Sequence, residues 1–119
     1  MTVRPLYPHL NIWTNPAAAL DYEIAQEKAS ALGRMGRALE AALGTLRAFD
    51  AQAREMTAEA KRERRALVDE AGYALWLFVV QRESLGLRDS PQLMRDYQVP
   101  GEVRARMGML PAKFPDKAY

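Results

Sequence analysis

The stretch AGYALWLFVV, from Ala71 to Val80, decides the fold because it ends in six consecutive large apolar residues, at positions 75–80. On a helix, such a run points in every direction around the axis, so the helix must be covered on all sides. One partner helix does not provide that cover in a chain of 119 residues. We therefore predict a helix at about 58–86, covered by the N-terminal arm, the C-terminal segment and another subunit.

A second long helix is predicted upstream, at 16–49. Asn15-Pro16 is a typical helix start, because Asn accepts hydrogen bonds from the first free amides and Pro has no N–H that needs a partner. Large apolar residues then recur at a three–four spacing, which favours coiled-coil or bundle packing. The recurring residues are Leu20, Ile24, Leu32, Met35, Leu39, Leu43, Leu46 and Phe49.

The sequence between these two helices leaves two alternatives open. There is no Gly or Pro from Asp50 to Arg65, so the helix either continues past residue 60 or the chain turns between about 50 and 60. In the second case Asp50 or Thr57 caps the next helix. A continuous helix from Pro16 to Gly86 would be far longer than ordinary helices. We therefore favour the turn and an antiparallel hairpin.

The N-terminal segment, residues 1–14, contains Pro5 and Pro8 and is predicted to be an extended arm. We expect the arm to lie on the helical body or on a second subunit, and a frayed terminus is the alternative. The reason is its content of large apolar residues, which are Leu6, Tyr7, Leu10, Ile12 and Trp13.

The C-terminal part of the chain is predicted to hold two short helices. Ser90-Pro91 starts the first, at 91–97, by the same capping argument. The dipeptide Pro100-Gly101 interrupts the chain before a second helix at 100–107. The tail, 109–119, is expected to be loose, although Phe114 could dock on the body.

The amino-acid composition excludes several classes of protein. Hydrophobic residues make up 49% and charged residues 27%, which excludes disorder for the chain as a whole and favours a single helical domain over 1–119. A net charge of +2 is too small to indicate nucleic acid or an anionic membrane by itself. Zero Cys excludes disulfides and thiolate chemistry and fits a cytoplasmic location. The longest apolar run, about ten residues, is half the length of a membrane span, so we expect a soluble protein.

The residues that carry chemistry are sparse. His9 is the only histidine, so the Glu-x-x-His motif of di-iron bundles and the two-histidine zinc motif are absent. Glu70 and Glu83 flank the apolar centre and would pair with arginines, an arrangement that is more often structural than catalytic. An Arg/Glu pocket between helices remains the alternative for a small-molecule binder or enzyme. We expect no catalytic residue, no cofactor and no metal.

Two basic segments are candidates for nucleic acid. Residues 93–107 have the rhythm of a helix-turn-helix, in which Arg95, Arg104 and Arg106 would contact the nucleic acid. However, the second helix begins with Pro100-Gly101-Glu102, which are poor base readers, so a pair of packing helices is favoured. The cluster at 61–65 has no interleaved aromatic residue and is typical of a solvated helix face. We do not expect a nucleic-acid partner.

Three stretches carry a family resemblance: RALVDEAGYALW at 65–76, VVQRE at 79–83 and GLRD at 86–89. They resemble a small group of uncharacterised bacterial helical proteins, known only as a domain of unknown function. The resemblance spans roughly residues 16–108. It implies a helical fold in a bacterial cytoplasm, and it implies no activity, cofactor or site residue.

These observations predict an all-α fold, in which a long antiparallel hairpin with two short C-terminal helices pairs with a second copy into a dimeric four-helix bundle. The predicted function is a non-enzymatic, homodimeric interaction or regulatory module, without a membrane and with an unidentified protein as a further partner. The predicted interface residues are Trp76, Phe78 and Val79, with Trp13 or Tyr7 crossing to the second copy.

Overall fold

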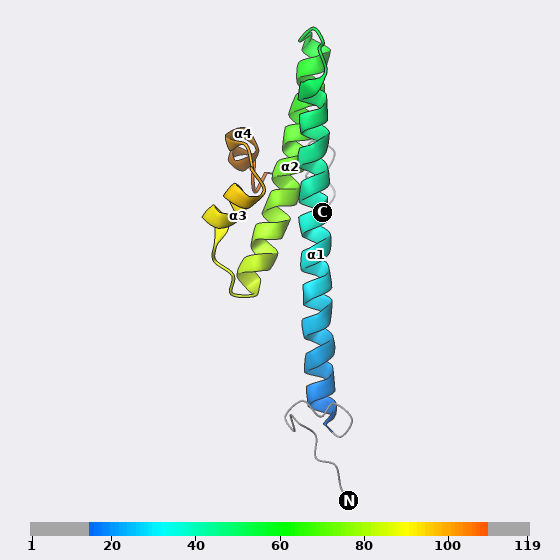
Figure 1. Cartoon of the computed structure of the whole chain (residues 1–119), viewed down its shortest axis with the longest axis vertical. Helices are drawn as coiled ribbons and strands as arrows, with labels where there is room; N and C mark the ends of the chain where they lie inside the picture. Colours follow the sequence, from blue (N-terminus) through cyan, green and yellow to red (C-terminus); the bar gives the residue numbers. More distant parts are fainter. Residues whose placement is uncertain (1–14, 110–119) are drawn as a thin grey trace, which may run out of the picture. The chain divides into compact units, whose positions relative to one another are not determined.

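A computed structural model describes residues 15–109, and within that range all regular secondary structure is helical (Figure 1). The four helices are α1 (Pro16–Ala51), α2 (Ala58–Ser84), α3 (Ser90–Asp96) and α4 (Gly101–Ala105). The predicted all-α fold, with a long helical hairpin and two short helices, is confirmed. Two compact units divide the chain between Gly33 and Arg34, so that α1 contributes to both.

In the first unit, the described residues form the start of α1. The Oδ1 atom of Asn15 accepts hydrogen bonds from the backbone N–H groups of Ala17 and Ala18, at 3.0 and 3.2 Å. This is the cap that Asn15-Pro16 predicts. Leu20 and Ile24 keep 56% and 44% of their surface exposed. This part of α1 therefore leaves apolar surface open among the described residues.

The core of the second unit lies between the later part of α1 and α2. Leu39, Leu43 and Leu75 are at most 1% exposed. Burying a leucine side chain stabilises the fold by about 1.5–3 kcal/mol relative to leaving it in water, so these contacts dominate the packing of the hairpin. The remaining buried apolar residues of the core are Leu46, Phe49, Ala60, Val68, Ala71, Phe78, Val79, Leu93, Met94, Val99 and Val103.

A turn joins the two long helices, so the first helix does not continue past residue 60. Helix α1 ends at Ala51 and α2 begins at Ala58. Thr57 is the N-cap, and its hydroxyl accepts a hydrogen bond from the N–H of Ala60 at 3.1 Å. Asp50, the other candidate cap, stays in the last turn of α1.

The apolar run on α2 is only partly covered by the described residues. Leu75, Phe78 and Val79 are buried, whereas Trp76 is 37% and Val80 46% exposed. The cover predicted from the arm and from the tail falls on residues 1–14 and 110–119, which lie outside the described residues. The described part of the chain therefore leaves one side of α2 open.

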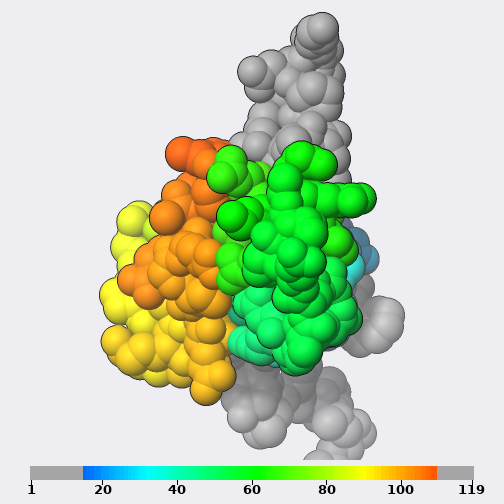
Figure 2. Space-filling view, turned by 90° about the horizontal axis from the view of Figure 1, so that it is seen from above, coloured from blue at the N-terminus to red at the C-terminus, as the bar shows by residue number. Residues whose placement is uncertain are grey.

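The C-terminal segment lies beside α2, and Figure 2 shows its yellow-to-orange atoms packed against the green part of the hairpin. Tyr97, at the end of α3, holds it there. Its ring meets Phe78 edge-on, with centroids 5.5 Å apart, and its carbonyl accepts a hydrogen bond from Arg47 at 3.2 Å. Gly36 makes room for the ring, because a Cβ there would lie 3.0 Å from the Tyr97 hydroxyl. Tyr97 thus contacts both long helices.

The helix ends differ from the predicted bounds by one to two residues. Helix α2 ends at Ser84 rather than 86, and Gly86 follows with a φ of +85°. Helix α4 spans Gly101–Ala105 rather than 100–107, because the chain turns from Arg106 to Gly108. Tight last turns of this kind provide hydrogen-bond donors for the carbonyl groups that have no partner at a helix end.

Helix α3 ends in a left-handed cap on a residue other than glycine. The N–H of Gln98 bonds to the carbonyl of Arg95, and the N–H of Val99 bonds to that of Met94, at 3.1 and 3.0 Å. This is the pattern of a Schellman motif, whose central position favours glycine. Gln98 occupies that position with a φ of +51°. At this φ the Cβ lies close to the backbone carbonyl oxygen, which lowers the free energy of unfolding.

Replacing Gln98 with glycine is expected to raise the free energy of unfolding by about 0.5–1 kcal/mol, because glycine adopts a positive φ without that steric cost. Urea denaturation followed by circular dichroism measures the change. The control is Gly86→Ala, which places a Cβ at a φ of +85° and should lower the free energy by about 1 kcal/mol. A Gln98→Gly protein less stable than the wild type would contradict this account.

Candidate functional site

The end of α4 approaches α2 closely at a glycine. A Cβ on Gly72 would lie 3.0 Å from the Cβ of Arg106 and 3.1 Å from both its carbonyl carbon and oxygen. A side chain at position 72 would therefore collide with backbone, which moves less readily than the tip of a side chain. Gly72 is the residue that allows α4 to rest on α2.

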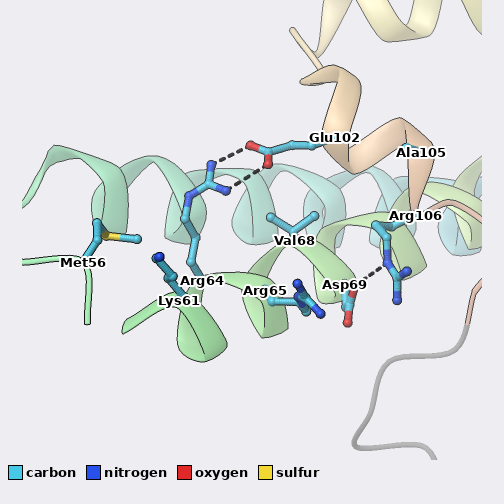
Figure 3. Close-up of a pocket in the computed structure, with 9 residues that line it drawn as sticks. All are labelled: Met56, Lys61, Arg64, Arg65, Val68, Asp69, Glu102, Ala105 and Arg106. Atoms are coloured by element: carbon cyan, nitrogen blue, oxygen red, sulfur yellow. Dashed lines mark hydrogen bonds and ion pairs between the residues drawn. The ribbon is translucent and has the colours of Figure 1, made fainter. Parts of the chain in front are cut away.

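Arg64 links three helices through one guanidinium group. Its Nε donates to Oδ1 of Asp50 on α1 at 2.8 Å, and its Nη1 donates to Oε2 of Glu102 on α4 at 2.9 Å. These hydrogen bonds lower the pKa of both carboxyl groups below its ordinary value, because they favour the ionised form. Figure 3 shows the contact between Arg64 and Glu102 across the space between α2 and α4.

A second pair joins the same two segments one turn further along α2. Nε of Arg106 donates to Oδ1 of Asp69 at 2.6 Å, and Asp69 is 7% exposed. A buried carboxylate is stable only when a partner satisfies it. Arg106 is therefore held on α2 by the need to pair with Asp69.

Between these two pairs lies a hollow of about 630 Å³, which we call the α2–α4 groove (Figure 3). Four of its lining residues are basic and two are acidic. Arg64 and Arg106 are paired with carboxylates, whereas the side chains of Lys61 and Arg65 make no ion pair or hydrogen bond within residues 15–109. The groove therefore carries a positive excess. Its lining residues are Met56, Lys61, Arg64, Arg65, Val68, Asp69, Glu102, Ala105 and Arg106.

A different surface of α2 is apolar, and we call it the Trp76 face. It consists of Tyr73, Trp76, Leu77 and Val80, whose spacing places them on one side of the helix. The rings of Tyr73 and Trp76 lie 6.1 Å apart at 34°. Trp76 and Val80 are exposed, while Tyr73 and Leu77 are half-buried. The turn after α4 borders the face, because a Cβ on Gly108 would lie 3.8 Å from Trp76 Cδ1.

The predicted interface residues fall into three groups. Trp76 is exposed and open to a partner. Phe78 and Val79 are 4% and 7% exposed, because the chain's own residues cover them, so a partner cannot reach them directly. Tyr7 and Trp13 lie outside the described residues.

The structure separates the three arginines that were candidates for nucleic acid. Arg95 and Arg104 line one hollow of about 350 Å³ beside α3. Arg106 lines the α2–α4 groove instead and pairs with Asp69. Arg106 therefore lines a different hollow from the one that Arg95 and Arg104 share.

The sequence suggested an Arg/Glu pocket between helices as an alternative but did not locate this groove. It predicted a solvated helix face for the cluster at 61–65, which agrees with the exposure of Lys61, Arg62, Glu63 and Arg65, whereas Arg64 is half-buried. It had no signal for the pairing of Arg64 with Glu102, because 38 positions separate the two residues. Only the packing of α4 brings them together.

The described residues contain neither a metal-binding cluster nor a membrane-spanning helix. No group of three or more His, Asp or Glu side chains within 15–109 is placed to hold a metal ion. No helix of that part of the chain has the length and apolar content to cross a membrane.

Comparison with known proteins identifies a family without an assigned activity. The family described as a family of unknown function (DUF6665) matches residues 11–114. No curated protein and no solved structure matches the chain. The interpretation of the groove and of the Trp76 face therefore rests on their own chemistry.

Two glycine substitutions test the contact between α4 and α2. Gly72→Ala is expected to lower the free energy of unfolding by about 1–3 kcal/mol, because the Cβ overpacks against the Arg106 backbone. Gly44→Ala is the control: it lies inside α1 with nothing within 4 Å of a Cβ, and should raise the free energy by about 0.5–1 kcal/mol. Urea denaturation of both variants checks this. Equal stabilisation by both would show that α4 does not rest on Gly72.

The Arg64 pairs predict a dependence of stability on pH. Asp50 and Glu102 have pKa values in the fold below their ordinary 3.8 and 4.5. Such groups add stability that is complete above the ordinary value and is lost as pH falls through the folded value. We expect Arg64→Gln to lower the urea midpoint of unfolding at pH 7. The difference in midpoint between the variant and the wild type should be smaller at about pH 3, where the carboxyl groups become protonated.

Arg62→Gln is the control for this experiment, because Arg62 lies on the same helix, is exposed and makes no ion pair within the described range. Its midpoint should follow the wild type at both pH values. A gap between wild type and Arg64→Gln that stays constant from pH 7 to pH 3 would rule out the two carboxylates as the source.

Proposed function

The chain belongs to the DUF6665 family, and from its geometry we propose that it is a homodimeric interaction module that pairs through the Trp76 face. The observation that carries the proposal is the exposure of Trp76 and Val80 on one side of α2, next to the half-buried Tyr73 and Leu77. A single exposed apolar residue is ordinary. A contiguous set of four on one side of a helix is typical of a contact surface, and Trp and Tyr are the residues that most often anchor one.

A second copy of the chain is the partner that this face suits. From Ala71 to Gln81 the helix contains no charged residue. In a two-fold dimer the same patch meets itself, so any charge within it would face a like charge. An uncharged face meets its copy without that repulsion. Antiparallel contact of two α2 helices along this face would join two hairpins into a four-helix bundle.

The Trp76 face needs further contacts to form a stable dimer. A standard interface buries about 800 Å² on each partner, which is more than four side chains of one helix supply. The arm, with Tyr7 and Trp13, is the further candidate that the sequence supplies.

The proposed module acts through contacts rather than through catalysis. Its dimer would display the groove and the α3 surface to solvent, where a further protein partner has access. The absence of cysteine in the whole sequence suits a reducing compartment, and we propose a cytoplasmic location.

Light scattering on a size-exclusion column tests the dimer. The wild type should elute with twice the mass of the 13.4 kDa chain. Trp76→Glu should raise the dimer dissociation constant by about thirty-fold or more, because a charge at an interface anchor costs at least about 2 kcal/mol. Its mass should approach that of one chain at concentrations where the wild type stays paired.

The matched control is Leu87→Glu, which adds the same charge at an apolar residue that is 40% exposed but lies outside the face. Its mass should remain that of the dimer. Circular dichroism checks that both variants keep their helices. A wild type that stays monomeric at every concentration, or a Trp76→Glu protein that stays dimeric, overturns the proposal.

A further inference from the structure

We propose that the α2–α4 groove binds a small organic phosphate, whose phosphate group lies between Lys61 and Arg65 and whose apolar part rests on Val68. This site is separate from the Trp76 face and does not depend on dimer formation. It rests on the distribution of charge, on the shape of the groove and on its mixed lining.

The charges in the groove divide into compensated and uncompensated ones. Arg64 is satisfied by Asp50 and Glu102, and Arg106 by Asp69. Lys61 and Arg65 are four positions apart, so they lie on the same side of α2, one turn from each other. Like charges at this spacing repel each other in a helix. A bound anion between them would remove that repulsion.

The size of the charge excess favours a dianion. Among the described residues, four basic and two acidic ones line the groove, so this lining has a net charge of about +2 by formal count, while Asp50, outside the lining, also pairs with Arg64. A phosphate monoester carries about −1.5 to −2 at neutral pH. Lysine supplies a compact cation, and arginine supplies a planar group that bonds to two phosphate oxygens at once. One of each at this spacing suits a phosphate group.

The paired residues hold the walls of this site in place. Arg64 is fixed by two carboxylates on two other helices, and Arg106 by a buried one. Figure 3 shows Lys61 and Arg65 projecting from α2 on either side of Arg64, with Lys61 towards Met56 and Arg65 towards Asp69. Ligand binding therefore has to order only two side chains, which keeps its entropic cost low.

The lining and the volume favour an organic phosphate over the inorganic ion. Val68, Ala105 and Met56 add apolar surface to the groove. The volume of about 630 Å³ lies within the range of small-molecule sites, and inorganic phosphate would fill only a small part of it. Among residues 15–109, no aromatic side chain lines the groove, so this part of the chain offers a nucleic-acid strand no residue on which to stack a base.

Calorimetric titration with phenyl phosphate, at constant ionic strength and neutral pH, tests the site on the full chain. The wild type should bind phenyl phosphate more tightly than inorganic phosphate, and phenol should not bind. The double variant Lys61→Gln/Arg65→Gln should bind phenyl phosphate at least about tenfold more weakly, because each residue loses a charged hydrogen bond.

The matched control is Arg62→Gln/Arg88→Gln, which loses the same two charges from exposed residues outside the groove. Its affinity should equal that of the wild type, which separates a built site from general attraction by positive charge. All four substituted side chains are exposed, and circular dichroism should show unchanged helices.

Three results would overturn the inference. The first is the absence of phenyl phosphate binding to the wild type up to about 10 mM, a level at which even weak sites fill. The second is an equal loss of affinity in both double variants. The third is equal affinity for inorganic and phenyl phosphate, which would show that the apolar lining contributes nothing.

Discussion

The structure depends on the need to cover α2, whose apolar residues occupy more than one side of the helix. One partner helix buries one stripe of another, so the later part of α1 covers only the side that includes Leu75. The C-terminal segment covers a second side, with Tyr97 against Phe78 and with Val103 fully buried. The third side, around Trp76, remains open in the described chain. Both the Trp76 face and the α2–α4 groove follow from how this cover is distributed.

The polar contacts determine where the C-terminal segment rests, while apolar burial supplies most of the stability. Gly72 allows the backbone of Arg106 to approach α2, and Asp69 then requires Arg106 as its partner. Arg64 adds a bridge to Glu102 on the other side of the groove. Ion pairs of partly exposed groups contribute little to stability but define geometry well. Their geometry is what leaves a cationic hollow between them.

The sequence predicted the local features of the fold more successfully than the candidate sites. Asn15 and Thr57 cap the two long helices, because a cap depends only on the next few residues. The sequence predicted that Phe78 and Val79 face a second copy of the chain. In the structure, the ring of Tyr97 at the end of α3 packs against Phe78 instead. Arg106 was grouped with Arg95 and Arg104 by its position in the chain, and the structure separates them.

By itself, the sequence determined that the chain is helical, and it favoured a turn between about 50 and 60 over one continuous helix. These properties follow from periodicity and capping, which act over one or two turns of helix. Within residues 15–109, only the tertiary structure decided which side of α2 stays open and which cations in the 61–65 cluster remain unpaired. Those outcomes depend on contacts such as that between Arg64 and Glu102, 38 positions apart. The physical reason is that α4 can satisfy a charge on α2 only once apolar burial has brought the two helices together.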